Sequence, residues 1–209
     1  GRGGGAAHRD RGGGVRGAGG AAFGDGVSAV RFCAVSAGEG RDDDDDGMAR
    51  RLTLLVTSWD GTARRYACRA REIGDVKSLN SIDLGAPALC GTFVGTDEDA
   101  ACVGCLDGSV RFVDFKTGAF RVVGAHDDGA VSAVEYDDGT KKLFTFGWDR
   151  TIRAWDLTKD ERGRAVSTTK TAGKCYAADL RDGKIFVATS DGQVLAYETR
   201  DLVRGVDGD

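Results

Sequence analysis

Four side chains in one stretch of the sequence have the types and spacing of a hydrogen-bonded set: His126, Thr145, Asp149 and Trp155. A carboxylate can hold one imidazole nitrogen, a hydroxyl can meet the other nitrogen, and an indole N–H can donate to that hydroxyl. Because each polar group can find a partner among the others, the set can be buried without an unpaired donor. We therefore interpret these four residues as a structural hydrogen-bond network.

A catalytic use of His126 has little support in the composition. The chain has two histidines, and the other one, His8, lies in a glycine-rich segment. A hydrolytic site needs convergent carboxylates, a nucleophile beside a base, or a metal cluster. Cys102 and Cys105 have the spacing of half a zinc site, but no second pair or nearby histidine completes it. We predict a protein that is not an enzyme and has no metal and no cofactor.

The segments around the network are predicted to be short antiparallel strands. Residues 124–157 contain alternating apolar runs with turn signals between them, as half-buried strands do. The stretch opens on Gly-Ala-His and closes on Trp155-Asp156. An opening histidine and a closing Trp-Asp pair, about 30 residues apart, are typical of one blade of a WD-repeat β-propeller.

The same unit recurs along the chain. Turn aspartates at Asp60, Asp107, Asp149 and Asp191 follow one another at steps of 47, 42 and 42 residues. A WD repeat has about 40–45 residues, so these steps agree with four repeats. We place the repeats at about 25–85, 86–124, 125–171 and 172–209.

Only the third repeat keeps the whole network. Valine stands at the position of Thr145 in the other three repeats, as Val56, Val103 and Val187. The outer strand of the fourth repeat is expected within residues 201–209. WD-repeat rings usually have about seven blades. We therefore expect an all-β chain with four blades of a probable seven, a fragment of a larger propeller.

The remaining composition narrows the class of protein. The net charge of −4 argues against a phosphate-binding surface by bulk charge. Six cysteines without paired spacing fit a reducing compartment, and five of them, Cys33 among them, fall on expected strands. No apolar run approaches the ~20 residues of a membrane span. The run Asp42–Asp46 is interpreted as a solvated loop, since a calcium site needs spaced ligands.

Residues 1–22 are rich in glycine and arginine and are interpreted as a disordered tail. A segment of this composition could instead contact RNA. Four arginines are only a thin basic signal, so nucleic acid is not expected as a partner except through this tail.

Several runs of the sequence are more specific than the general WD-repeat pattern: LLVTSWDGTARRY, GCLDGSVRFVDFKTG, VVGAHD, SAVEY and FGWDRTIRAWD. They resemble the first four blades of the mitotic-checkpoint (budding uninhibited by benzimidazole) WD-repeat family over residues 24–200. The sister family, the mRNA-export WD-repeat factors of the nuclear pore, shares much of this pattern. The run KCYAAD at residues 174–179 looks more like that sister family. The Asp-rich loop and the Gly/Arg tail are not features of the checkpoint family.

The resemblance implies a binding function on one face of the propeller. Trp59 and Trp148 each precede a turn aspartate, and the equivalent pair in both families contacts a GLEBS-type peptide motif. Leu106 and Arg150 are expected beside the same groove. The implied partners are checkpoint kinases or kinase-like proteins with GLEBS-type motifs, a kinetochore scaffold and a ubiquitin-ligase complex. The implied location is the nucleus and the kinetochore.

Overall fold

The computed structural model describes residues 23–33, 51–69, 76–158 and 164–204. The predicted Gly/Arg tail and the run Asp42–Asp46 lie outside these residues. Within them the fold is almost entirely strand, in four antiparallel sheets. The chain is a WD-repeat β-propeller with four blades, as its repeats predict.

Each blade follows the chain from its innermost strand outwards. The first contains β1 (Val27–Phe32), β2 (Arg51–Ser58), β3 (Thr62–Arg69) and β4 (Val76–Asp83). The second contains β5 (Ala88–Val94), β6 (Asp97–Cys105), β7 (Ser109–Asp114) and β8 (Ala119–Ala125). The third contains β9 (Val131–Asp137), β10 (Lys142–Gly147), β11 (Thr151–Trp155) and β12 (Ser167–Lys170). The fourth contains β13 (Cys175–Arg181), β14 (Lys184–Thr189) and β15 (Val194–Glu198).

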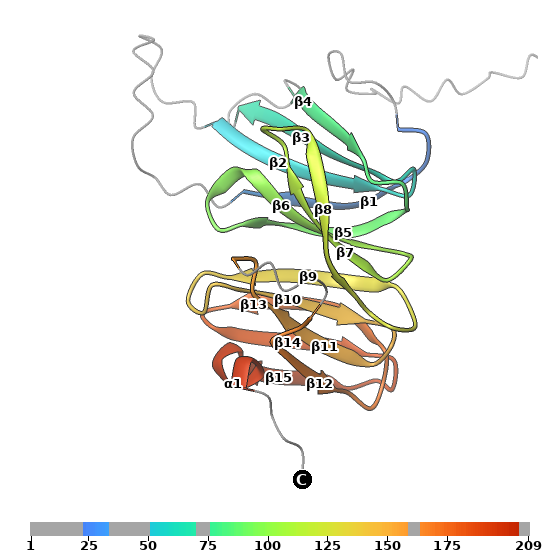
Figure 1. The fold of residues 1–209 in the computed structure, drawn as a ribbon, viewed down its shortest axis with the longest axis vertical. Coiled ribbons are helices and arrows are strands. Elements are labelled where there is room, and N and C mark those ends of the chain that lie inside the picture. Colours follow the sequence, from blue (N-terminus) through green and yellow to red (C-terminus); the bar gives the residue numbers. More distant parts are fainter. Residues whose placement is uncertain (1–22, 34–50, 70–75, 159–163, 205–209) are drawn as a thin grey trace, which may run out of the picture.

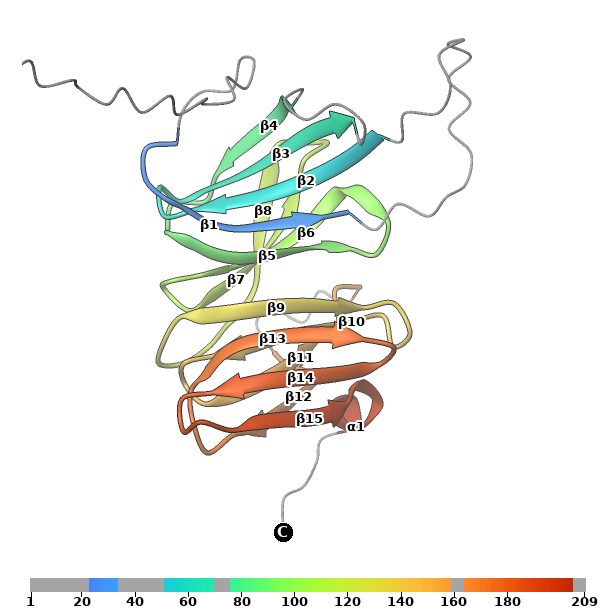
Figure 2. The same ribbon diagram turned by 180° about the vertical axis from the view of Figure 1, so that it is seen from behind.

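The innermost strands contact one another in chain order. Strand β5 lies against β1 on one side and β9 on the other, and β13 follows β9 (Figures 1 and 2). Arg31 of β1 also forms an ion pair with the buried Glu135 of β9, which links the first blade to the third. Burial raises the pKa of Glu135 to about 7, although the positive charge of Arg31 opposes that rise.

The core consists of one apolar layer between each pair of successive blades. Leu55, Ala63 and Ile82 of the first blade pack on the second blade. Phe144 and Phe146 of the third blade pack on the fourth. Buried apolar area is the main source of stability in such a stack, at about 25 cal/mol per Å². The stability of each blade therefore comes mainly from the apolar layer that it shares with its neighbours.

The fourth blade differs from the expectation at its outer edge. The prediction of an outer strand within residues 201–209 is wrong for residues 201–204, which belong to the helix α1 (Thr199–Arg204). Residues 205–209 lie outside the described ranges. Leu202 is fully buried, and its neighbour Val203 packs on the same core. Successive side chains of a strand point to opposite faces, whereas a helical turn can direct both toward one core.

Cys33 lies just past the end of β1 rather than within it, and it is buried. All six cysteines are free thiols. Burial raises the pKa of Cys33 to about 11 and that of Cys105 to about 11, which favours the neutral thiol. The thiols therefore behave as small apolar groups of the core.

Gly124 marks the closest packing between the second and third blades. A Cβ atom added at Gly124 would lie 2.2 Å from one carbon of the Trp155 ring and 2.5 Å from another. Trp155 is itself fully buried, so its ring has no free space into which to move. The absence of a side chain at Gly124 is what allows the indole to lie where it does.

We predict that Gly124→Ala lowers the free energy of unfolding by roughly 1–3 kcal/mol, the usual cost of overpacking a core. Urea denaturation would measure the loss. The matched control is Gly139→Ala, since the nearest atom to a Cβ at Gly139 is 3.4 Å away, an ordinary contact. Equal stability of the two variants would show that the Gly124 contact does not restrict the fold.

Candidate functional site

The structure brings His126, Thr145, Asp149 and Trp155 together inside the third blade. The imidazole Nδ1 of His126 lies 2.8 Å from Asp149 Oδ1, and its Nε2 lies 2.8 Å from Thr145 Oγ1. Trp155 Nε1 donates to the same threonine hydroxyl at 2.8 Å. His126, Thr145 and Trp155 are all buried.

The protons of this network can all run in one direction. Trp155 N–H donates to the Thr145 oxygen, the Thr145 hydroxyl donates to His126 Nε2, and His126 Nδ1–H donates to Asp149. That arrangement requires a neutral imidazole and an ionised carboxylate. Burial lowers the pKa of His126, which favours the neutral ring although Asp149 opposes the shift. Burial alone would raise the pKa of Asp149, but hydrogen bonds from His126 and Thr151 outweigh it and hold that pKa below 3.8.

Each turn aspartate of the first three blades also stabilises the turn in which it lies by accepting hydrogen bonds. Asp60 accepts from the backbone N–H of Thr62, Asp107 from that of Ser109, and Asp149 from that of Thr151, each at 3.0 Å. The Thr or Ser hydroxyls donate to the same oxygens. In the fourth blade Asp191 accepts instead from the Thr189 hydroxyl.

In the first three blades an arginine four residues after the turn aspartate completes the turn, a role that we did not predict from the sequence. Arg64, Arg111 and Arg153 donate to Asp60, Asp107 and Asp149 over 3.1, 2.8 and 3.1 Å. The signal was visible as the runs DGTAR, DGSVR and DRTIR. Each arginine bridges the turn to the following strand, and Arg153 reaches Asp127 as well.

The residues just before the turn aspartates occupy one equivalent corner in every blade. The backbone N–H of Trp59 donates to Gly26, that of Leu106 to Pro87, that of Trp148 to Ala130 and that of Ser190 to Lys174. All four acceptors belong to the loop before an innermost strand. These corners therefore share one face of the propeller, which we call the top face. Trp59 is 43% exposed and Leu106 39% exposed on it.

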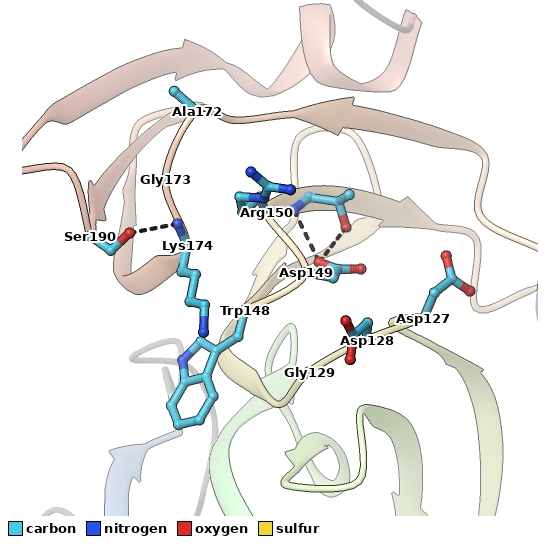
Figure 3. Close-up of a pocket in the computed structure, with 11 residues that line it drawn as sticks. Asp127, Asp128, Gly129, Trp148, Asp149, Arg150, Ala172, Gly173, Lys174 and Ser190 are labelled. Atoms are coloured by element: carbon cyan, nitrogen blue, oxygen red, sulfur yellow. Dashed lines mark hydrogen bonds between the residues drawn. The ribbon is translucent and has the colours of Figure 1, made fainter.

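A pocket of about 690 Å³ opens on the top face between the third and fourth blades (Figure 3). Trp148, Arg150, Lys174 and Ser190 line it, and Asp127 and Asp128 lie at its other side. The Nζ of Lys174 lies 6.0 Å from the centre of the Trp148 ring. The pocket thus combines an aromatic surface with charges of both signs.

The indole N–H of Trp148 is buried and has no hydrogen-bond partner among the described residues. An unpaired buried donor costs about 1–3 kcal/mol, so this N–H destabilises the fold locally beside the pocket. Lys174 was named in the sequence only as part of a family-like run, and its place beside Trp148 emerges from the fold. Asp127 and Asp128 carried no sequence signal of their own.

Arg150 adds local strain to the same pocket. Its φ is +63°, a value that the other three turns reach with glycine at Gly61, Gly108 and Gly192. A residue with a Cβ in this conformation costs free energy that the surrounding structure must balance. Arg150 is exposed and its guanidinium extends into the pocket region (Figure 3).

Within the described residues no group of three or more His, Cys, Asp and Glu side chains is placed to hold a metal ion. In the same residues no helix is long and apolar enough to cross a membrane.

The blades, the repeated turns and the buried network define a WD-repeat β-propeller protein. No protein-family model matches the chain. Curated relatives do: it is 31% identical over 180 residues to the mitotic checkpoint protein bub3 of Dictyostelium discoideum, covering 85% of this chain and 47% of the relative. It is 30% identical over 149 residues to the mitotic checkpoint protein bub-3 of Caenorhabditis elegans, covering 71% and 42%.

A poly(A)+ RNA export protein of Schizosaccharomyces pombe is 27% identical over 177 residues, covering 75% of this chain and 48% of that protein. The chain spans about half the length of the curated relatives it matches. Within the WD-repeat proteins it thus resembles the mitotic-checkpoint family, with the mRNA-export proteins as further relatives.

We predict that the contribution of His126 to the stability of the fold falls between pH 7 and pH 5. Its pKa in the folded protein is below the ordinary 6.5, so the unfolded chain binds more protons in this range. Glu135 acts with the opposite sign, since its folded pKa of about 7 exceeds the ordinary 4.5.

Comparison of the wild-type chain with His126→Asn isolates the histidine, because Glu135 is common to both. Urea midpoints at pH 7 and pH 5 should show less acid destabilisation in His126→Asn than in the wild type. An identical change with pH in the two proteins would mean that His126 does not titrate with unfolding.

Proposed function

We propose that the chain is part of a non-catalytic WD-repeat adaptor of the mitotic spindle checkpoint, whose top face binds GLEBS-type peptide motifs of checkpoint kinases or kinase-like proteins. A kinetochore scaffold and a ubiquitin-ligase complex are further candidate partners. The proposed location is the nucleus, at kinetochores. The resemblance to checkpoint relatives supports the pathway, and the pocket beside Trp148 supports a binding role.

The observation that carries the proposal is the unpaired indole N–H of Trp148 at the pocket. Because this N–H is buried, a peptide carbonyl would accept its hydrogen bond only if the side chains around the indole move on binding. Trp59 presents a second exposed indole at an equivalent corner two blades away. Tryptophan is the residue most enriched at the energetic centre of protein interfaces.

The charges around Trp148 would set the register of the peptide rather than its affinity. Lys174 and Arg150 supply positive charge, and Asp127 and Asp128 supply negative charge at the far side. Exposed charges of this kind contribute little free energy each but select among partners. Leu106 offers a smaller apolar contact at the second corner.

A second candidate is an mRNA-export factor. The Schizosaccharomyces pombe export relative covers a similar share of this chain, and the run from Lys174 to Asp179 resembles the export family. Both candidates use the same face, and they differ in the protein that supplies the peptide. Binding to peptides from the two sources would separate them.

We predict that Trp59→Ala combined with Trp148→Ala weakens binding of a synthetic GLEBS-type peptide by at least 30-fold, because one central tryptophan contributes about 2–4 kcal/mol. Isothermal titration calorimetry would measure the affinity. The matched control is Phe120→Ala, an aromatic residue 41% exposed on the outer strand β8.

Circular dichroism and thermal unfolding would establish that the double variant keeps its fold. Unchanged peptide affinity in a folded double variant would contradict the assignment of the two tryptophans. Equal weakening by Phe120→Ala would show that the effect is not specific to the top face.

A further inference from the structure

Arg150 is a charged residue at a position that favours glycine. It follows the turn aspartate of the third blade at a φ of +63°, and the residues at this position in the other three blades are Gly61, Gly108 and Gly192. A side chain in this conformation costs free energy. Among the residues that the structure describes, the guanidinium has no hydrogen bond or ion pair that would offset this cost. The charged group is therefore free to meet a ligand.

Lys174 also stands where the other blades have no charge. Its carbonyl accepts the corner N–H of Ser190, and the residues with this role in the other three blades are Gly26, Pro87 and Ala130. Its own N–H donates to the Ser190 hydroxyl at 2.9 Å, which fixes the loop. Its ammonium lies 6.0 Å from the centre of the Trp148 ring and has no carboxylate partner in the described part of the chain.

Arg150 and Lys174 thus place two unpaired cations at the junction of the third and fourth blades, and the other two described junctions have neither. The negative charges of the pocket differ from them. Asp127 forms an ion pair with Arg153, so its charge is already balanced. Asp128 lies at the other side of the pocket (Figure 3) and would repel an anion there. The pocket therefore favours an anion on the side of the two cations.

The two basic groups suit one ligand chemistry. A guanidinium presents parallel N–H donors that match the oxygens of a carboxylate or a phosphate, and an ammonium adds a mobile point charge. The Lys174 ammonium stands over the Trp148 ring. When it turns toward an anion of the ligand, that face of the indole becomes available to an apolar group. The matching ligand carries an anionic side chain next to an apolar one.

We propose that Arg150 and Lys174 form a subsite for an anionic side chain of the bound peptide, while an apolar neighbour of that side chain lies on Trp148. The anion is a carboxylate of glutamate or aspartate, or the phosphate of a modified residue. The proposal rests on the proposed function, because it names the group that the same pocket selects. It also gives a reason for an arginine where the other three turns have glycine.

Short peptides blocked at both ends test the subsite without any GLEBS motif. Each contains a leucine beside a glutamate, a phosphoserine or, as the neutral reference, a glutamine. The chain has three tryptophans, so a heteronuclear NMR spectrum contains three indole N–H signals, and Trp148→Phe identifies the one from the pocket. Titration followed at that signal should show an anionic peptide binding at least about threefold more tightly than the glutamine peptide.

A preference for glutamate identifies a carboxylate subsite, and a preference for phosphoserine alone identifies a phosphate subsite. Each of these results supports the proposal. Equal affinities for all three peptides would overturn it, as would an indole signal that none of them shifts.

Variants of the two cations test their roles separately. Arg150→Gly and Lys174→Met should each weaken binding of the anionic peptide about threefold, and together about tenfold, with binding of the glutamine peptide unchanged. Arg150→Gly should also raise the urea midpoint, because glycine adopts a positive φ without strain. An arginine with a purely structural role would lower that midpoint on removal. The matched control is Lys116→Met, which removes one charge from the turn after β7, at the other end of its blade.

The same variants separate failure of the subsite from failure of the proposed function. A wild-type chain that binds no GLEBS-type peptide would contradict the proposed function, and the short peptides would still decide on the subsite. A GLEBS-type peptide that binds the wild type and the Arg150→Gly, Lys174→Met double variant equally would leave the proposed function intact and overturn the subsite. Circular dichroism of each variant establishes folding before its affinity is interpreted.

Discussion

The hydrogen bond between Asp149 and His126 is the constraint on which the third blade depends. Asp149 holds the imidazole from the turn after β10, while Thr145 holds it from within β10 and links it to Trp155 on β11. Two strands, the turn between them and the preceding loop are thereby joined through groups that are largely shielded from water. A buried network of this kind stabilises the fold only while every donor and acceptor is paired. The other blades dispense with it, because valine replaces Thr145 and their junctions are apolar.

The same turn that anchors the network also presents two of the residues that we propose to bind a peptide. Trp148 precedes Asp149 and Arg150 follows it, so the buried half of the turn fixes the exposed half. The Trp148 indole N–H has no hydrogen-bond partner among the described residues, Arg150 has a positive φ, and both residues line one pocket. A rigid corner with unsatisfied polar groups loses little conformational entropy when a peptide binds. The fold is therefore locally less stable at the corner where we propose that a partner binds.

Much of the fold could be predicted from the sequence, because repeats with a fixed spacing and an alternating pattern report strand positions directly. The described residues form four blades, one for each of the four turn aspartates that mark the repeats. The helix α1 could not be predicted, since the packing of Leu202 and Val203 on one core is a tertiary effect. The arginines after the turn aspartates were visible in the sequence, but only the turn geometry shows why they are there. Lys174 approaches Trp148 across a blade junction, a contact that no local pattern encodes.

A double-mutant cycle on Thr145 and Trp155 tests most directly whether the buried hydrogen bonds stabilise the third blade. Thr145→Val, Trp155→Phe and the double variant would be compared by their free energies of unfolding in urea. Because Thr145 accepts the indole proton of Trp155, the account predicts that removal of both costs less than the two single costs combined, by about 1–2 kcal/mol. Costs that add within about 0.5 kcal/mol would contradict it, and the third blade would then be held by apolar packing alone.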